Sequence, residues 1–177
     1  MKLNYQTFGT TVTIAAGSIF AALVAAVSYL FQIPIPATSG YFNFGESIIY
    51  VTALVMGPYV GAFAGGGAAI SDLLSSGYAI YAPGTLIVKA TEGFTVGWLN
   101  NKLKQKMNST LSAVISVLTG GTVMIFGYFL YEIPLRGVVV ALAEVPFNAV
   151  QMIIGVIIAI PIMHAVLRVF PQLNSHL

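Results

Sequence analysis

Long apolar runs recur along this chain from near Thr10 to near Phe170, and no stretch of ordinary soluble composition separates them. Charged residues make up only 7% of the 177 residues, whereas a typical soluble domain has roughly 25%. A chain of this kind buries its surface in lipid and not in a large soluble core. We therefore predict a single membrane-embedded domain, residues 1–177, that crosses the cell membrane several times and contacts the lipid bilayer along its sides.

The breaks between the apolar runs predict an all-α fold with six helices. Proline, glycine and polar residues separate helices that we place at about residues 8–30, 45–56, 59–75, 84–99, 111–131 and 146–170. Gly57-Pro58 favours two helices at that point, and one long kinked helix is the alternative. Residues 137–145 either extend the last helix or form a short separate element. Residues 32–45 and 75–83 are predicted to be loops.

The positions of the basic residues predict the orientation of these helices. Cytoplasmic loops of membrane proteins are enriched in Lys and Arg. Lys2, the three lysines within 102–106, and Arg168 fall on one side if the chain crosses the membrane six times. Both termini are then cytoplasmic, and Arg136 is the one clear exception, on the outer side. The net charge of +2 is too small to indicate a nucleic-acid partner.

Four of the twelve charged side chains lie within one glycine-rich stretch, residues 39–98. Ionisable groups at membrane depth are costly and by default face a bundle interior or a water-filled cavity. Lys89 and Glu92 share a helix face, so they either neutralise each other or contact a ligand, Lys89 serving an anionic or carbonyl group. Glu46 begins a helix, where the dipole favours an acid, whereas Asp72 lies near a helix C-terminus without that support.

Aromatic and amide side chains accompany these charges. The tyrosines near the loops are either interfacial aromatics or a surface that stacks on a flat heterocycle. Glu144, Asn148 and Gln151 recur at spacings of four and three, which places them on one stripe of an otherwise apolar helix. We predict a polar pocket between the helices near one membrane face, with a lining of Asn43, Glu46, Asp72, Tyr78, Tyr81, Lys89, Glu92, Glu144, Asn148 and Gln151.

The sequence lacks the common catalytic patterns. It has no GxxxxGK[ST] or GxSxG motif, no cysteine, and two histidines far apart, so we expect no ATP hydrolysis by the chain, no metal, no cofactor and no enzymatic activity. Two alternatives remain open. One is a self-sufficient secondary transporter coupled to protons or cations, which would show uptake by this chain alone. The other is a small membrane enzyme using Asp72 and Glu92, which would show turnover.

The central third of the chain resembles the substrate-binding S components of energy-coupling factor (ECF) vitamin transporters. The motifs that carry the resemblance occur in the family's order: IPIP at 33–36, GYFNFGE at 40–46, GP at 57–58 followed by GxxxGG at 61–66, DLLSSGY at 72–78, AP at 82–83, and KATEG at 89–93. The chain is most similar to the branch that serves hydroxymethylpyrimidine, pyridoxine, pantothenate and riboflavin. It departs from the pattern in Glu46, where many relatives have Asp, and in Ala68-Ala69, near a frequent Gly-Ser.

This resemblance implies a six-helix subunit that captures a vitamin or precursor at the outer face, under the first and third interhelical loops. Ala22 and Ala26 of the first helix would dock on a separate T component, and two cytoplasmic ABC-type ATPases would supply the energy. The subunit would deliver its substrate by toppling in the membrane. Hydroxymethylpyrimidine and pyridoxine-like compounds stand first among the candidate substrates.

Overall fold

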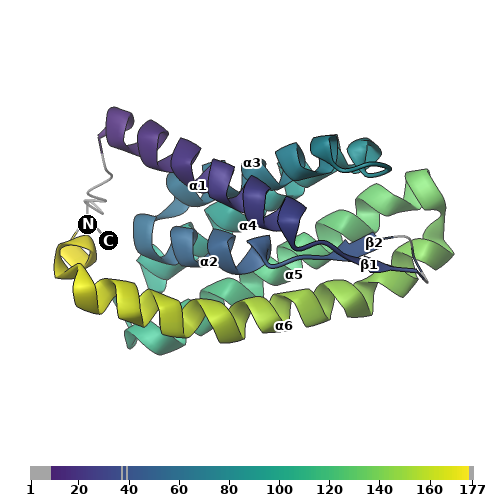
Figure 1. Ribbon diagram of the computed structural model, residues 1–177. Helices are drawn as coiled ribbons and strands as arrows, with labels where there is room; N and C mark the ends of the chain where they lie inside the picture. Colours follow the sequence, from purple (N-terminus) through teal and green to yellow (C-terminus); the bar gives the residue numbers. More distant parts are fainter. Residues whose placement is uncertain (1–8, 37, 39, 176–177) are drawn as a thin grey trace.

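The computed structural model describes residues 9–36, 38 and 40–175. These residues form a bundle of six α-helices with a short two-stranded hairpin at one end (Figure 1). The helices are α1 (Thr10–Leu30), α2 (Gly45–Met56), α3 (Pro58–Leu74), α4 (Ala82–Leu103), α5 (Ser109–Arg136) and α6 (Val138–Val169). Two 3₁₀ turns, η1 (Ala79–Tyr81) and η2 (Pro171–Ser175), complete the described elements. The predicted all-α fold with six helices is confirmed.

Two glycines with positive φ set the corners of the bundle. Gly57 (φ 87°) ends α2, and Pro58 then begins α3, so the interpretation as two helices is confirmed. Gly137 (φ 87°) separates α5 from α6. A side chain disfavours this backbone conformation, and glycine does not. Residues 138–145 therefore extend the last helix, which resolves the alternative left open by the sequence.

The ends of α4 and α5 differ from the sequence prediction because polarity is a weak guide to helix ends. The α4 helix continues past residue 99 to Leu103, since the Asn and Lys residues there are acceptable helix formers. The α5 helix starts at Ser109, where the Asn108 side chain accepts a hydrogen bond from the Leu111 N–H. It also continues past residue 131 to Arg136, with Pro134 in its last turn.

The predicted loop at 32–45 contains a hairpin of β1 (Ile33–Ile35) and β2 (Gly40–Phe42). The strands are antiparallel, with Pro34 opposite Tyr41. Three residues with a central proline carry too little alternation to be recognised as a strand. The hairpin extends toward the end of the bundle where α5 meets α6 (Figure 1), and the chain then enters α2.

Small residues bring α3 close to both of its main neighbours. A Cβ on Gly67 would lie 2.1 Å from the Ala21 carbonyl oxygen in α1, and one on Gly65 would lie 2.0 Å from the Lys89 carbonyl oxygen in α4. Backbone contact of this kind is the usual way in which helices associate in lipid. On α1, Gly17 is buried against this packing.

Three of the described helices, α1, α5 and α6, are long and apolar enough to cross a membrane. The α2 helix has 12 residues and is about 18 Å long, which is shorter than the ~30 Å hydrocarbon core. The count of six helices is thus established, whereas six crossings with cytoplasmic termini remain a prediction. The start of α1 and the end of α6 lie at the same end of the bundle, away from the hairpin (Figure 1), which is compatible with that topology.

Candidate functional site

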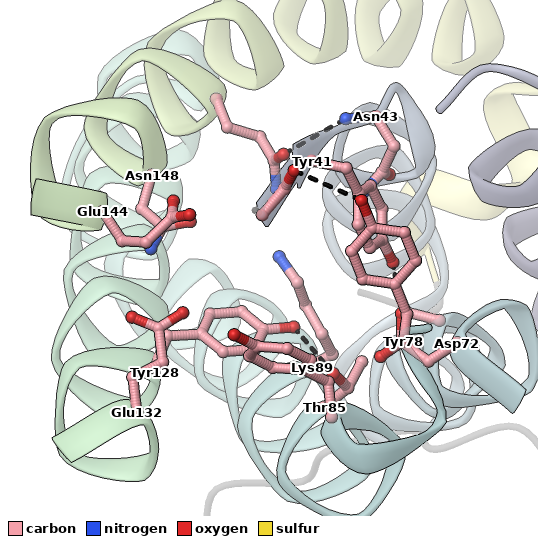
Figure 2. Close-up of a pocket in the computed structure, with 14 residues that line it drawn as sticks. Tyr41, Asn43, Asp72, Tyr78, Thr85, Lys89, Tyr128, Glu132, Glu144 and Asn148 are labelled. Atoms are coloured by element: carbon pink, nitrogen blue, oxygen red, sulfur yellow. Dashed lines mark hydrogen bonds between the residues drawn. The ribbon is translucent and has the colours of Figure 1, made fainter. Parts of the chain in front are cut away.

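A cavity with about 500 Å³ of empty space, including its open mouth, lies at the hairpin end of the bundle. Residues from the hairpin and from α3, α4, α5 and α6 surround the space (Figure 2). The structure places eight of the ten predicted residues in the lining: Asn43, Asp72, Tyr78, Tyr81, Lys89, Glu144, Asn148 and Gln151.

The other two predicted residues, Glu46 and Glu92, do not line the cavity but pair with Lys89. The Lys89 ammonium pairs with Glu46 of α2, and its Nζ lies 3.1 Å from Glu92 Oε2. Tyr50 donates its hydroxyl hydrogen to Glu92 Oε1 at 2.8 Å. All of these side chains are buried, and buried charges are tolerated when they are paired in this way. The predicted pairing of Lys89 with Glu92 is present, and Glu46 joins it.

Gln151 and Asn43 connect the hairpin to this buried charge network. The Gln151 Nε2 donates to Glu46 Oε2 at 3.2 Å, and its Oε1 accepts from the Asn43 backbone N–H at 3.3 Å. The Asn43 side-chain oxygen accepts from Ser28 Oγ at 3.1 Å and from the Gly45 N–H at 2.8 Å. Both amide side chains therefore hold the site together. The inward orientation predicted for the polar stripe of α6 is present.

Tyrosines from the two loops form the mouth of the cavity. The Tyr41 hydroxyl donates a hydrogen bond to Asp72. Burial, reinforced by the Asp72 carboxylate, raises the pKa of Tyr41 well above its usual value, so Tyr41 remains a donor. The Tyr41 and Tyr78 rings meet edge to face, with centroids 4.7 Å apart. Burial also raises the pKa of Tyr81 to about 12. The mouth thus presents aromatic surface with protonated hydroxyls.

Sequence reasoning missed three polar lining residues: Thr85, Tyr128 and Glu132. The Tyr128 hydroxyl donates to Thr85 Oγ1 at 3.2 Å, and the Lys89 Nζ lies 5.6 Å from the centre of the Tyr128 ring. One signal was available in the sequence. Tyr128 and Glu132 are four apart in an apolar helix, as Thr85 and Lys89 are, and such pairs share a helix face.

Two carboxylates of the lining have oxygens without a hydrogen-bond partner. Glu132 Oε2 and Glu144 Oε1 are buried in this state, and each residue is 5% exposed. These oxygens can accept hydrogen bonds from a bound molecule. The described residues contain no group of three or more His, Cys, Asp or Glu side chains arranged to hold a metal ion. The groups that the cavity offers to a ligand are its tyrosines, the buried Lys89 ammonium and the carboxylates.

Residues 8–168 match the family model described as "ECF-type riboflavin transporter, S component". The chain belongs to this family. The resemblance inferred from the motifs is therefore confirmed. The S components are vitamin-transporter subunits of the membrane and not a family of enzymes.

The chain is also similar to individual proteins. The chain is 40% identical over 136 residues to an uncharacterized protein of Pyrococcus woesei, covering 76% of this chain and 88% of that protein. It is 29% identical over 143 residues to the thiamine precursor transporter HmpT of Lactococcus lactis subsp. cremoris, covering 80% of each. The solved S component of a bacterial ECF transporter superposes with a TM-score of 0.66 at 16% identity, covering 90% of this chain and 98% of that one. That structure shares the fold.

Proposed function

We propose that this chain is the substrate-capture subunit of an ECF-type ABC importer and binds a water-soluble vitamin or precursor at the outer face. The observation that carries the proposal is the cavity at the hairpin end of the bundle, lined by tyrosines and by buried polar and charged side chains, in a chain of the S-component family. Its mouth offers tyrosine rings that can stack on a heterocycle, and its wall offers polar groups that can orient it.

Hydroxymethylpyrimidine and pyridoxine-like compounds are the first candidates for the substrate. One relative over most of the chain is a thiamine precursor transporter, and the tyrosine mouth suits a small flat ring. Riboflavin, after which the matching family model is described, is the next compound to test, together with pantothenate.

The proposed partners are a T component and two ABC-type ATPases, since the sequence has no ATP-binding motif of its own. The chain would cross the cell membrane six times with both termini in the cytoplasm, and it would topple to carry the cavity inward. The exposure of Ala22 and Ala26 on α1 supports a docking role, because the neighbouring small residues Gly17 and Ala25 face inward. Small exposed side chains permit close approach of another helix in lipid.

Binding is tested first by mass spectrometry of the gently purified protein for a co-purifying compound, followed by a thermal-shift screen of water-soluble vitamins. A ligand at a thousandfold excess over its Kd stabilises the native state by about 4 kcal/mol. One vitamin or precursor that gives a large shift supports the proposal. If the unfolding temperature changed with proton or sodium concentration and with no vitamin, the proposal would be overturned in favour of an ion-coupled transporter.

Docking is tested by Ala22→Leu and Ala26→Leu in cells that carry the T component and the ATPases. We expect both variants to impair complex assembly and uptake while the purified subunit still binds substrate. Thr122→Leu, at an exposed position of α5, is the control. Normal uptake by both α1 variants would place the docking surface elsewhere.

A further inference from the structure

Acidic side chains outnumber basic ones in the described lining of the cavity. Its described lining contains one ammonium, Lys89, and three carboxylates, Asp72, Glu132 and Glu144. Lys89 is already paired with two further carboxylates outside the lining. Asp72 accepts the Tyr41 hydrogen bond. Glu132 and Glu144 each keep one buried carboxylate oxygen without a hydrogen-bond partner.

The corner at Gly137 brings these two carboxylates to one wall of the cavity. Glu132 lies five residues before that glycine in α5 and Glu144 seven residues after it in α6. Figure 2 shows both side chains on the side of the cavity that also holds Asn148, across from Tyr78 and Asp72.

Two neighbouring groups, Arg136 and Gly40, approach this wall without donating a hydrogen bond to Glu132 Oε2 or Glu144 Oε1. Arg136, one turn beyond Glu132, directs its Nη1 to the Thr38 carbonyl oxygen at 2.5 Å. A Cβ on Gly40 would lie 2.0 Å from Glu144 Oε1, so the hairpin backbone lies directly against this carboxylate, and only glycine fits there. A buried carboxylate oxygen that lacks a donor is costly, and two like charges facing one cavity add to that cost.

We propose that Glu132 and Glu144 bind the amino-substituted or protonated edge of an aromatic nitrogen heterocycle. This inference rests on the proposed function and narrows its substrate to a class. N–H groups on such an edge would supply the hydrogen bonds that Glu132 Oε2 and Glu144 Oε1 lack, and the tyrosines would cover the ring faces. A carboxylate or phosphate group of a ligand would instead lie beside the two acidic side chains Glu132 and Glu144. The Lys89 ammonium is already paired with Glu46 and Glu92.

The first test uses the unaltered protein and measures dissociation constants by calorimetry. The probes are hydroxymethylpyrimidine, which carries a ring amino group, the same ring with hydrogen in place of that group, and pantothenate. We expect the amino compound to bind at least about tenfold more tightly than the compound without the amino group, as for loss of a charged hydrogen bond. We expect no competition from pantothenate. Equal affinity for the two pyrimidines, or tighter binding of pantothenate, would overturn the inference.

The second test uses Glu132→Gln and Glu144→Gln, which keep the shape and remove the charge. Each should weaken binding of the amino compound by about tenfold or more and change binding of the compound without the amino group much less. Thr110→Val, at the opposite end of α5 where Thr110 bonds His164, is the control and should leave both affinities unchanged. Unchanged affinity in both glutamine variants would contradict the inference.

The two proposals fail in different ways. If the chain binds riboflavin or pantothenate and not the amino compound, the capture function stands and the assignment of the acidic wall is wrong. If no vitamin or precursor binds to the unaltered protein, the capture function itself is wrong, and the inference falls with it. The unliganded unfolding temperature of each variant shows whether it is folded.

Discussion

At the scale of single residues, the buried Lys89 ammonium is shared by carboxylates from two helices, Glu46 of α2 and Glu92 of α4. Each of the three residues is at most 3% exposed. The sequence left open whether Lys89 pairs with Glu92 or contacts an anionic or carbonyl group of a ligand. Its two ion pairs link α2 to α4 beside the cavity, and Lys89 also lines the cavity, so its contact with a ligand stays a prediction.

Lys89→Met should destabilise the protein by about 3 kcal/mol, because it leaves two buried carboxylates without their cation. The triple variant Lys89→Met, Glu46→Gln, Glu92→Gln should recover most of this loss, since no unpaired charge remains. The measurement is thermal or denaturant unfolding in detergent without ligand. A single variant as stable as the parent protein would show that the ion pairs contribute little.

Lys104, directly after α4, predicts a dependence of stability on pH. Its burial lowers the pKa of the ammonium from 10.5 to about 8. The unfolded chain therefore binds more protons than the folded one between these values, so stability should rise as pH increases from about 8 to 10.5. Lys104→Gln should remove this rise, whereas Lys106→Gln, at an exposed position, should keep it. The measurement is the unfolding temperature of each variant between about pH 8 and 10.5. Identical pH profiles for the two variants would show that Lys104 does not cause the rise.

At the scale of elements, α3 depends on glycines that differ in what they touch. Gly65 and Gly67 lie against the backbones of α4 and α1, whereas a Cβ on Gly66 would meet the end of the Leu86 side chain at 3.3 Å. The sequence places three consecutive glycines in one helix and does not distinguish among them. The distinction arises from the positions of α1 and α4 on either side.

Gly65→Ala and Gly67→Ala should each destabilise the bundle by about 1–3 kcal/mol, because the added methyl group forces two backbones apart. Gly66→Ala should be neutral or slightly stabilising, since Leu86 can move and alanine is the better helix former. Unfolding temperatures of the three variants form a matched set. If Gly66→Ala lost as much stability as Gly65→Ala and Gly67→Ala, the assignment of backbone contacts to Gly65 and Gly67 alone would be wrong.

At the scale of the whole molecule, the absence of cysteine makes the proposed topology directly testable. Ser76, after α3, and Gln105, after α4, are both exposed and lie on connections at opposite ends of α4. If the chain crosses the membrane as proposed, these two positions face opposite compartments.

In intact cells, Ser76→Cys should react with a membrane-impermeant maleimide, and Gln105→Cys should react only after the membrane is opened. The expected difference follows from the lysines beside Gln105, which favour the cytoplasmic side. The unaltered, cysteine-free chain is the control for background labelling. Labelling of both positions from outside would refute the six-crossing topology.

The sequence determined the class of this protein, the number of its helices and most of the polar residues that turn inward. These properties follow from local information: apolar runs, Gly-Pro breaks, and polar residues that an apolar environment forces toward the interior. The family motifs, too, were readable in order along the chain.

Only the tertiary structure decided which of these residues meet. Glu46 reaches Lys89 across 43 positions, Tyr41 reaches Asp72 across 31, and the corner at Gly137 sets Glu132 on the same wall as Glu144. Contacts over such separations depend on how several helices pack at once, and helical periodicity specifies only the face on which a residue lies. The same packing separated Glu46 and Glu92 from the cavity while it placed the rest of the predicted set around it.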